Sequence, residues 1–182
     1  MLNLVRSPLV RVPDSLARQG VSLRPEQDGD LDFLRALYRS TREAELAQVD
    51  WSDAQKDSFV QMQFNAQRQH YRGTLENVGY DLILQNGAPI GRLYSQERVT
   101  QLHIVDIALI PGQRGHGLGG KLLEALGYNA AQVGKGLGIF VEHQNPARHL
   151  YDRLGFEVIA DAGIYIEMER PAAMGLANGP IS

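Results

Sequence analysis

A glycine-rich segment between a long apolar run and a strong helix former constrains this chain more than any other feature of its sequence. The apolar run QLHIVDIALIPG is typical of a buried strand that ends at Pro111. The segment RGHGLGGKLLEAL, residues 114–126, comes directly after it and holds four glycines within six residues. Glycines this dense at the start of a helix indicate backbone amides that approach an anion without obstruction by side chains.

Three phosphate-binding patterns fit this segment. G-x-x-x-x-G-K, residues 115–121, requires Ser or Thr after the lysine to bind magnesium, and Leu122 stands there instead. G-x-G-x-x-G fits a dinucleotide fold, with Glu142 as the later acidic residue, but Pro-Gly-Gln-Arg separates the strand from the first glycine. We keep dinucleotide binding as a minor alternative. R-x-x-G-x-G, which starts at Arg114, fits both in position and in its surroundings.

Composition narrows the class of protein. The chain has 182 residues, which suits a single domain with a full hydrophobic core. A net charge of −3 disfavours a nucleic-acid partner, and no run of about 18 apolar residues indicates a membrane span. The chain lacks cysteine, so it has no disulfide, no thiolate metal ligand and no cysteine nucleophile. We expect a cytoplasmic protein that needs no metal.

The hydrophobic pattern predicts an α/β fold in a single domain over residues 21–170. Residues 1–20 do not resemble a signal peptide and are expected to form an irregular arm, and residues 171–182 a flexible tail. The expected order is β-α-α-β-β-β-α-β-α-β-β, a central mixed sheet of six to seven strands with helices on both faces. The helices are expected over residues 28–46, 52–73, 117–136 and 145–154, and Asn86-Gly87 predicts a hairpin between the second and third strands.

Two segments resemble the GNAT superfamily of acyl-CoA-dependent N-acyltransferases. PGQRGHGLGGKLLEAL is similar to the loop and helix of that family, and NPARHLYDRLGFEV is similar to its last motif. The motifs occur in the family's order, and the predicted element order is also the family's. In topology the resemblance extends from Val21 to Glu169, and its informative part runs from Asp106 to Phe156. It implies an enzyme that transfers an acetyl group from acetyl-CoA.

The resemblance implies where coenzyme A binds. The pyrophosphate would meet the amides of the loop and the helix start, with Arg114 and His116 at its rim and Leu118 packed beneath. The loop glycines are Gly115, Gly117, Gly119 and Gly120. In the family, the backbone of the preceding strand pairs with the pantetheine arm, and by position this backbone belongs to Ala108, Leu109 and Ile110. Asn145 would lie near the pantetheine or cap the last helix, and both alternatives are open.

Three side chains are the candidates for catalysis. By resemblance, the hydroxyl of Tyr151 would protonate the departing thiolate. The acceptor amine must lose a proton before it attacks, and His103 and Glu142 on the two central strands are the candidate bases. Asp106 lies between them in sequence, and its direction depends on whether its strand is bulged. Without cysteine, direct attack in a ternary complex is the simplest route.

The acceptor is expected to be a primary amine of a small molecule or a peptide. It would lie between the first two helices and the hairpin, among side chains of mixed aromatic and polar character: Trp51, Phe59, Gln63, His70, Tyr71, Arg92 and Tyr94. A non-catalytic acyl-CoA-binding module is the alternative from another class of protein. The oligomeric state is open, with a homodimer among the alternatives.

Overall fold

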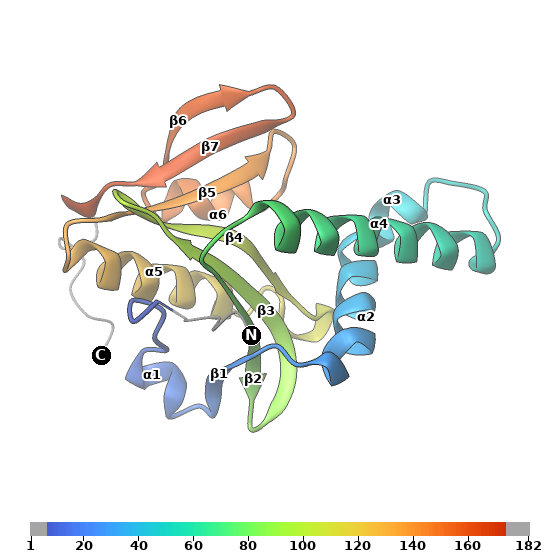
Figure 1. The fold of residues 1–182 in the computed structure, drawn as a ribbon, viewed down its shortest axis with the longest axis horizontal. Coiled ribbons are helices and arrows are strands. Elements are labelled where there is room, and N and C mark those ends of the chain that lie inside the picture. The colour runs from blue at the N-terminus through green and yellow to red at the C-terminus, as the bar shows by residue number, and fades with distance from the viewer. Residues whose placement is uncertain (1–6, 174–182) are drawn as a thin grey trace.

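The computed structural model describes residues 7–173, which form one seven-stranded sheet with helices on both faces (Figure 1). The strands are β1 (Val21–Pro25), β2 (Val78–Gln85), β3 (Ala88–Glu97), β4 (Gln101–Leu109), β5 (Gly136–Glu142), β6 (Glu157–Ala162) and β7 (Tyr165–Arg170). The helices are α1 (Asp14–Ala17), α2 (Leu31–Thr41), α3 (Glu43–Leu46), α4 (Asp53–Thr74), α5 (Leu118–Ala131) and α6 (Arg148–Arg153), with 3₁₀ turns at Asp28–Asp30 and Pro111–Gln113.

The sheet is mixed, in the order β1-β2-β3-β4-β5-β7-β6, and the predicted element order is confirmed. Among the described strands, β4 and β5 form the one parallel pair, and α5 makes the crossover between them. A dinucleotide fold needs a doubly wound parallel sheet, so this arrangement does not support that alternative. Asn86 and Gly87 both have positive φ, 52° and 83°, as the hairpin turn between β2 and β3 requires.

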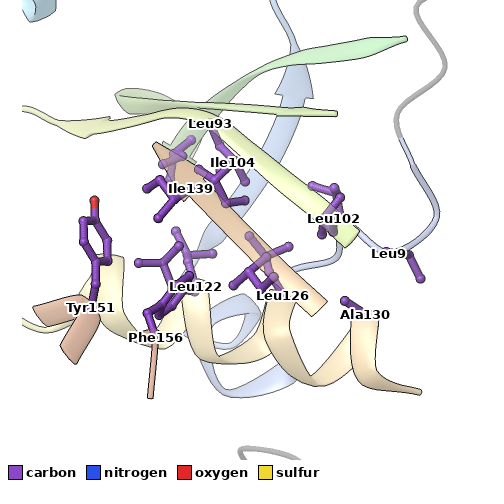
Figure 2. Close-up of a cluster of buried hydrophobic side chains, with 14 of the residues drawn as sticks. Leu9, Leu93, Leu102, Ile104, Leu122, Leu126, Ala130, Ile139, Tyr151 and Phe156 are labelled. Carbon is purple, nitrogen blue, oxygen red and sulfur yellow. The ribbon is translucent and has the colours of Figure 1, made fainter. Parts of the chain in front are cut away.

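Two hydrophobic clusters cover the opposite faces of the sheet. On one face, α5 buries Leu122 and Leu126 against Ile104 of β4, together with Tyr151 and Phe156 (Figure 2). On the other face, α2 and α4 pack against β2 through a separate cluster that includes Leu34, Phe64 and Leu82. Each fully buried leucine contributes about 1.5–3 kcal/mol of transfer free energy. The two clusters therefore hold one helical layer against each face of the sheet.

The first predicted helix is divided. The structure has a 3₁₀ turn, α2 and α3 over the residues expected to form a continuous helix. The hydroxyls of Ser40 and Thr41 donate to the carbonyls of Leu37 and Tyr38 at 2.6 and 2.7 Å, and Arg42 leaves the helical region with φ −108° and ψ 1°. Side-chain bonds of this kind compete with the helix and favour its end.

Residues 7–20, the described part of the expected irregular arm, contain a short helix and buried side chains. α1 forms in this segment, and Leu9, Val10 and Leu16 are buried in the cluster beside α5. The amide of Asn129 on α5 donates to the carbonyl of Leu9 at 2.9 Å. Most of the predicted flexible tail, residues 171–182, lies outside the described residues. Within residues 7–173, no helix combines the length and the apolar character needed to cross a membrane.

Candidate active site

The two central strands separate halfway along their length. β4 and β5 pair in parallel from Gln101 to Ile104, opposite Gly136 to Ile139, and no pairing between them continues beyond that point in the described chain. The register of β4 against β3 shifts there, because Tyr94 faces Asp106 while Ser95 faces Ile104. Val105 is thus the extra residue of a β-bulge, which bends its strand. The remainder of β4 keeps β3 as a neighbour on one side and has an open edge on the other.

A cavity of about 510 Å³, which we call the β4–β5 cavity, opens at this separation. It is lined by Asp106, Ala108, Glu142, Asn145 and Tyr151, among other residues. The cavity therefore brings together one predicted catalytic acid, Tyr151, and one predicted base, Glu142. It lies where the predicted pantetheine-binding strand ends.

The glycine-rich loop leads from β4 into α5. Gly115 and Gly117 have φ of 76° and 81°, a region that side chains strain to adopt, and α5 begins at the next residue, Leu118. A Cβ at Gly120 would lie 3.4 Å from Leu150 of α6, so this glycine allows close packing. Leu118 is buried beneath the loop as predicted.

The amides of this loop are available for an anion. Among the described residues, the backbone amides of residues 115–120 donate to no backbone carbonyl, and the first helical bond is from Lys121 to Gly117 at 3.0 Å. Unpaired amides at the start of a helix of 14 residues bind negative charge through their dipoles. The donor set therefore fits a diphosphate, the charged group of coenzyme A.

Arg114 differs from its predicted place at the rim. Its Nε donates to the carbonyl of Leu109 at 2.8 Å, and its Nη2 donates to the hydroxyl of Ser40 at 2.7 Å. The guanidinium thus ties the loop to the end of β4 and to α2. His116 is exposed, and its place beside the diphosphate stays a prediction.

The direction of the backbone groups in β4 differs from the prediction for the pantetheine contacts. The amide of Ile110 donates to Ile90 of the β3 side at 2.9 Å, and the carbonyl of Ala108 also points toward β3, beside Gly91. Because backbone groups alternate along a strand, Leu109 and Ile107 present theirs to the open edge. Of the three predicted residues, only Leu109 faces that edge, and Ile107, which we did not predict, faces it as well.

Tyr151 lies on α6 with its ring buried and its hydroxyl end at the β4–β5 cavity. The ring centroid is 5.6 Å from that of Phe156, and the hydroxyl points away from the cluster around Leu122 (Figure 2). Burial, with a smaller contribution from the charge of Asp106, raises the pKa of Tyr151 to about 12. No described side chain accepts a hydrogen bond from this hydroxyl, which leaves its proton available.

His103 lies outside the β4–β5 cavity and is 2 % exposed. Burial and the nearby charge of Arg98 lower the pKa of His103 to about 3, far from the value near 6.5 on which its predicted role as a base rested. Gln101 is held by a bond from its Nε2 to Glu169 at 3.3 Å, so its Oε1 accepts from Nδ1 of His103 at 3.1 Å. The imidazole is therefore neutral at pH 7, with its Nε2 lone pair free to accept.

A second cavity, of about 640 Å³, adjoins the first beneath α4, and we call it the α4 cavity. His103 lines it, as do three residues of the predicted acceptor set, Gln63, His70 and Tyr71. The two cavities share several lining residues, which are Tyr38, Arg42, Gln67, Tyr71, Val105, Phe140 and Tyr165. An acceptor in the α4 cavity would thus reach the β4–β5 cavity directly.

The other predicted acceptor residues serve different purposes. Trp51 and Phe59 pack against each other with ring centroids 5.3 Å apart and line neither cavity. The hydroxyl of Tyr94 donates to Glu26 at 2.6 Å. Arg92 lines the β4–β5 cavity but is 3 % exposed.

A buried ionic network joins α4 to strands β3 and β4, and we did not predict it from the sequence. Nη2 of Arg92 donates to Asp106 at 2.7 Å and to Gln67 of α4 at 2.9 Å. The hydroxyl of Tyr71 lies 3.4 Å from the same carboxylate, and burial raises the pKa of Tyr71. The bulge at Val105 directs Asp106 toward this arginine. Arg92 is the one charged residue within the apolar run PIGRLY, and this isolated charge is the sequence signal that could have identified it.

The side chain of Asn145 bonds to the turn before α6, which supports part of the prediction that it caps this helix. Its Oδ1 accepts from the amide of Ala147 at 2.9 Å, and α6 begins at Arg148 rather than at Pro146. Asn145 also lines the β4–β5 cavity, so its Nδ2 is available there. Within residues 7–173, no group of three or more His, Cys, Asp or Glu is arranged to hold a metal ion.

Comparisons with known proteins agree with this geometry. Residues 78–158 match the family model described as acetyltransferase (GNAT) domain, and no curated protein matches the sequence. The structure resembles the PaiA N-acetyltransferase from Thermoplasma acidophilum in complex with coenzyme A, at 18 % identity and a TM-score of 0.61 over 83 % of this chain and 98 % of that one. It also resembles an acetyltransferase from Thermus thermophilus (19 % identity, TM-score 0.59, 83 % and 96 % coverage). A third similar structure is the ribosomal-protein-S18-alanine N-acetyltransferase from Escherichia coli, with 22 % identity and a TM-score of 0.53 over 84 % of this chain and 94 % of that one.

The matched residues hold both motifs and the strands that separate. This domain and the fold define an acyltransferase, and the resemblance noted in the sequence is confirmed. Residues 78–158 match a GNAT domain, and the similar structures support the GNAT superfamily for this chain. α2 and α4, which line the α4 cavity, lie outside the matched residues.

Proposed function

We propose that the protein transfers the acetyl group of acetyl-CoA to a primary amine of a small molecule or a peptide. The observation that carries the proposal is the separation of β4 from β5 next to the unpaired amides of the glycine-rich loop. Together they offer a site for a diphosphate and, one strand length away, an open strand edge and a cavity with Tyr151 and Glu142. A coenzyme A complex of a protein with the same fold supports this choice of donor.

Each residue has a role in the proposed mechanism. The amides of residues 115–120 bind the diphosphate. The open edge at Ile107, together with the amide of Leu109, binds the pantetheine arm, whereas the carbonyl of Leu109 accepts from Arg114. The acetyl thioester supplies the activated carbonyl carbon. The amine nitrogen attacks that carbon, the C–S bond breaks, and the amide bond forms within a ternary complex.

Two protons move in this reaction. Glu142, at the β4–β5 cavity, takes the proton that the attacking amine loses. Tyr151 has its pKa raised to about 12, so it is protonated at neutral pH and donates to the departing sulfur. We assign the base to Glu142 rather than His103, because a pKa of about 3 makes the imidazole a weak proton acceptor. His103 instead accepts a hydrogen bond from the acceptor molecule.

Replacement of the tyrosine tests this function. We expect Tyr151→Phe to lower kcat by about 100-fold or more, as loss of a general acid does. The affinity for acetyl-CoA, measured by calorimetry, should stay within about twofold, since the ring remains. Tyr128→Phe on α5, which lines neither cavity, is the matched control. An unchanged kcat in Tyr151→Phe across a panel of amines would remove Tyr151 from the mechanism.

A further inference from the structure

The two connected cavities differ in their charged lining, because carboxylates line only one of them. The β4–β5 cavity is lined by three carboxylates, Glu45, Asp106 and Glu142, and by two arginines, Arg42 and Arg92, of which Arg92 is paired with Asp106. The α4 cavity has no Asp or Glu among its described lining residues, and it contains Arg42, Arg98 and two histidines. An acceptor that extends through both cavities would therefore meet all of the lining carboxylates at its reacting amine, and at its other end arginines with no carboxylate in the described lining.

The two arginines keep donors for a ligand. Nη1 of Arg42 donates to Glu45 at 2.9 Å, and Nη1 of Arg98 lies 4.0 Å from Glu167. Neither carboxylate lines the α4 cavity. A guanidinium has five donor hydrogens and binds a carboxylate or a phosphoryl group through two of them at once. Each arginine therefore has donors beyond the ones engaged by the protein.

Aromatic rings form the wall between the two cavities. Tyr38, Tyr71, Phe140 and Tyr165 line both of them, and Phe140 and Tyr165 are 42 % and 45 % exposed. Large apolar rings exposed inside a cavity favour a ligand with a flat or apolar body. The guanidinium of Arg98 lies 6.0 Å from the ring of Phe140, so the apolar wall leads to a cation.

We propose that the preferred acceptor is an amine that carries an anionic group, a carboxylate or a phosphoryl group, at the far end of an apolar or aromatic body. The amine lies at Glu142 in the β4–β5 cavity, the body lies along Phe140 and Tyr165, and the anion is bound by Arg42 and Arg98. This inference rests on the proposed function and names its class of acceptor. The neutral His103 adds a hydrogen-bond acceptor to the same cavity but no charge.

Matched acceptors test the proposal directly. 4-(Aminomethyl)benzoate and 4-(aminomethyl)benzamide share the amine and the ring and differ in one charge, and the corresponding phenylphosphonate supplies the phosphoryl group. With acetyl-CoA in excess, we expect kcat/KM for at least one anionic acceptor to exceed that for the amide by tenfold or more, mainly through KM. Equal values for all three acceptors, or a preference for the amide, would overturn the proposal.

Variants locate the anion. In the double variant Arg42→Gln/Arg98→Gln we expect the anionic preference to fall to about twofold or less, while turnover of the amide continues and shows that the site is folded. Arg39→Gln, in the last turn of α2 and outside both cavities, should keep the full preference. A preference that survives in the double variant would contradict the assignment to these arginines.

A binding measurement separates this proposal from the proposed function. 4-(Acetamidomethyl)benzoate and its amide are the corresponding products, and their binding to the protein with coenzyme A requires no catalysis. If no amine is acetylated, the proposed function fails, yet tighter binding of the anionic product, lost in the double variant, would still support the anion site. Equal binding of the two products would overturn it.

Discussion

The glycine-rich loop and the layer formed by α2 and α4 differ in the groups that they offer to a ligand. The loop offers main-chain amides, and its glycines matter because they lack side chains. The helical layer offers side chains, which an ionic network of Arg92, Asp106 and Gln67 holds in place. The family model covers the first region and omits α2 and α4. The loop that offers backbone groups thus lies within the matched residues, whereas the helices that offer side chains lie outside them.

The largest expected effect is a loss of stability when the ionic network of Arg92, Asp106 and Gln67 is broken. Arg92→Met removes the partner of Asp106, which is mostly buried, and should lower the free energy of unfolding by about 3 kcal/mol. Urea denaturation measures this loss. Arg39→Met breaks an ion pair that is more exposed and should cost less than about 0.5 kcal/mol. A double-mutant cycle with Asp106→Asn should give a coupling free energy above about 1 kcal/mol, and additive losses would show that the pair does not act as one unit.

A substitution in the glycine-rich loop should change the affinity for acetyl-CoA more than the free energy of unfolding. Gly117→Val puts a branched side chain at φ 81°, which costs about 1–2 kcal/mol of folding free energy, and obstructs the amides that follow. We expect the Kd for acetyl-CoA to rise about tenfold or more, as measured by calorimetry. Gly112→Ala, where the added methyl group meets open space, is the control. If both variants bound acetyl-CoA equally well, the loop would not be the anion site.

Acid should weaken the protein through His103. Its pKa in the folded protein is about 3, below the unfolded value near 6.5, so the unfolded state binds the extra proton between these two pH values. Stability is therefore present above pH 6.5 and is lost as the pH falls toward 3, by up to about 1.4 kcal/mol per pH unit. His103→Asn should flatten that part of the stability profile. The exposed His149, replaced in the same way, should leave it unchanged, and identical slopes in all three proteins would contradict the prediction.

The smallest effect is expected at Asn145. Asn145→Ala removes the acceptor for the amide of Ala147 and should lower the free energy of unfolding by about 1 kcal/mol. Asn145→Asp keeps the acceptor and should recover most of the loss. An unchanged Kd for coenzyme A in Asn145→Ala would assign this side chain to the turn alone, whereas a rise above fivefold would add a contact with the ligand.

The sequence predicts the main-chain features of this protein better than the side-chain ones. Local patterns placed the strands, the Asn86-Gly87 hairpin and the glycine loop, because each depends on residues close together in sequence. The bulge at Val105 depends on how β4 meets β3, and no pattern within β4 marks it. The burial that lowers the pKa of His103 comes from several elements at once, which explains why an unperturbed pKa misled the choice of base.

A crystal structure of the protein with acetyl-CoA tests the central claim most directly. We predict that diphosphate oxygens lie within hydrogen-bond distance of the amides of residues 115–120, with the thioester between β4 and β5 and its sulfur near the Tyr151 hydroxyl. A diphosphate bound elsewhere on the molecule, with the amides of residues 115–120 left without it, would contradict the account.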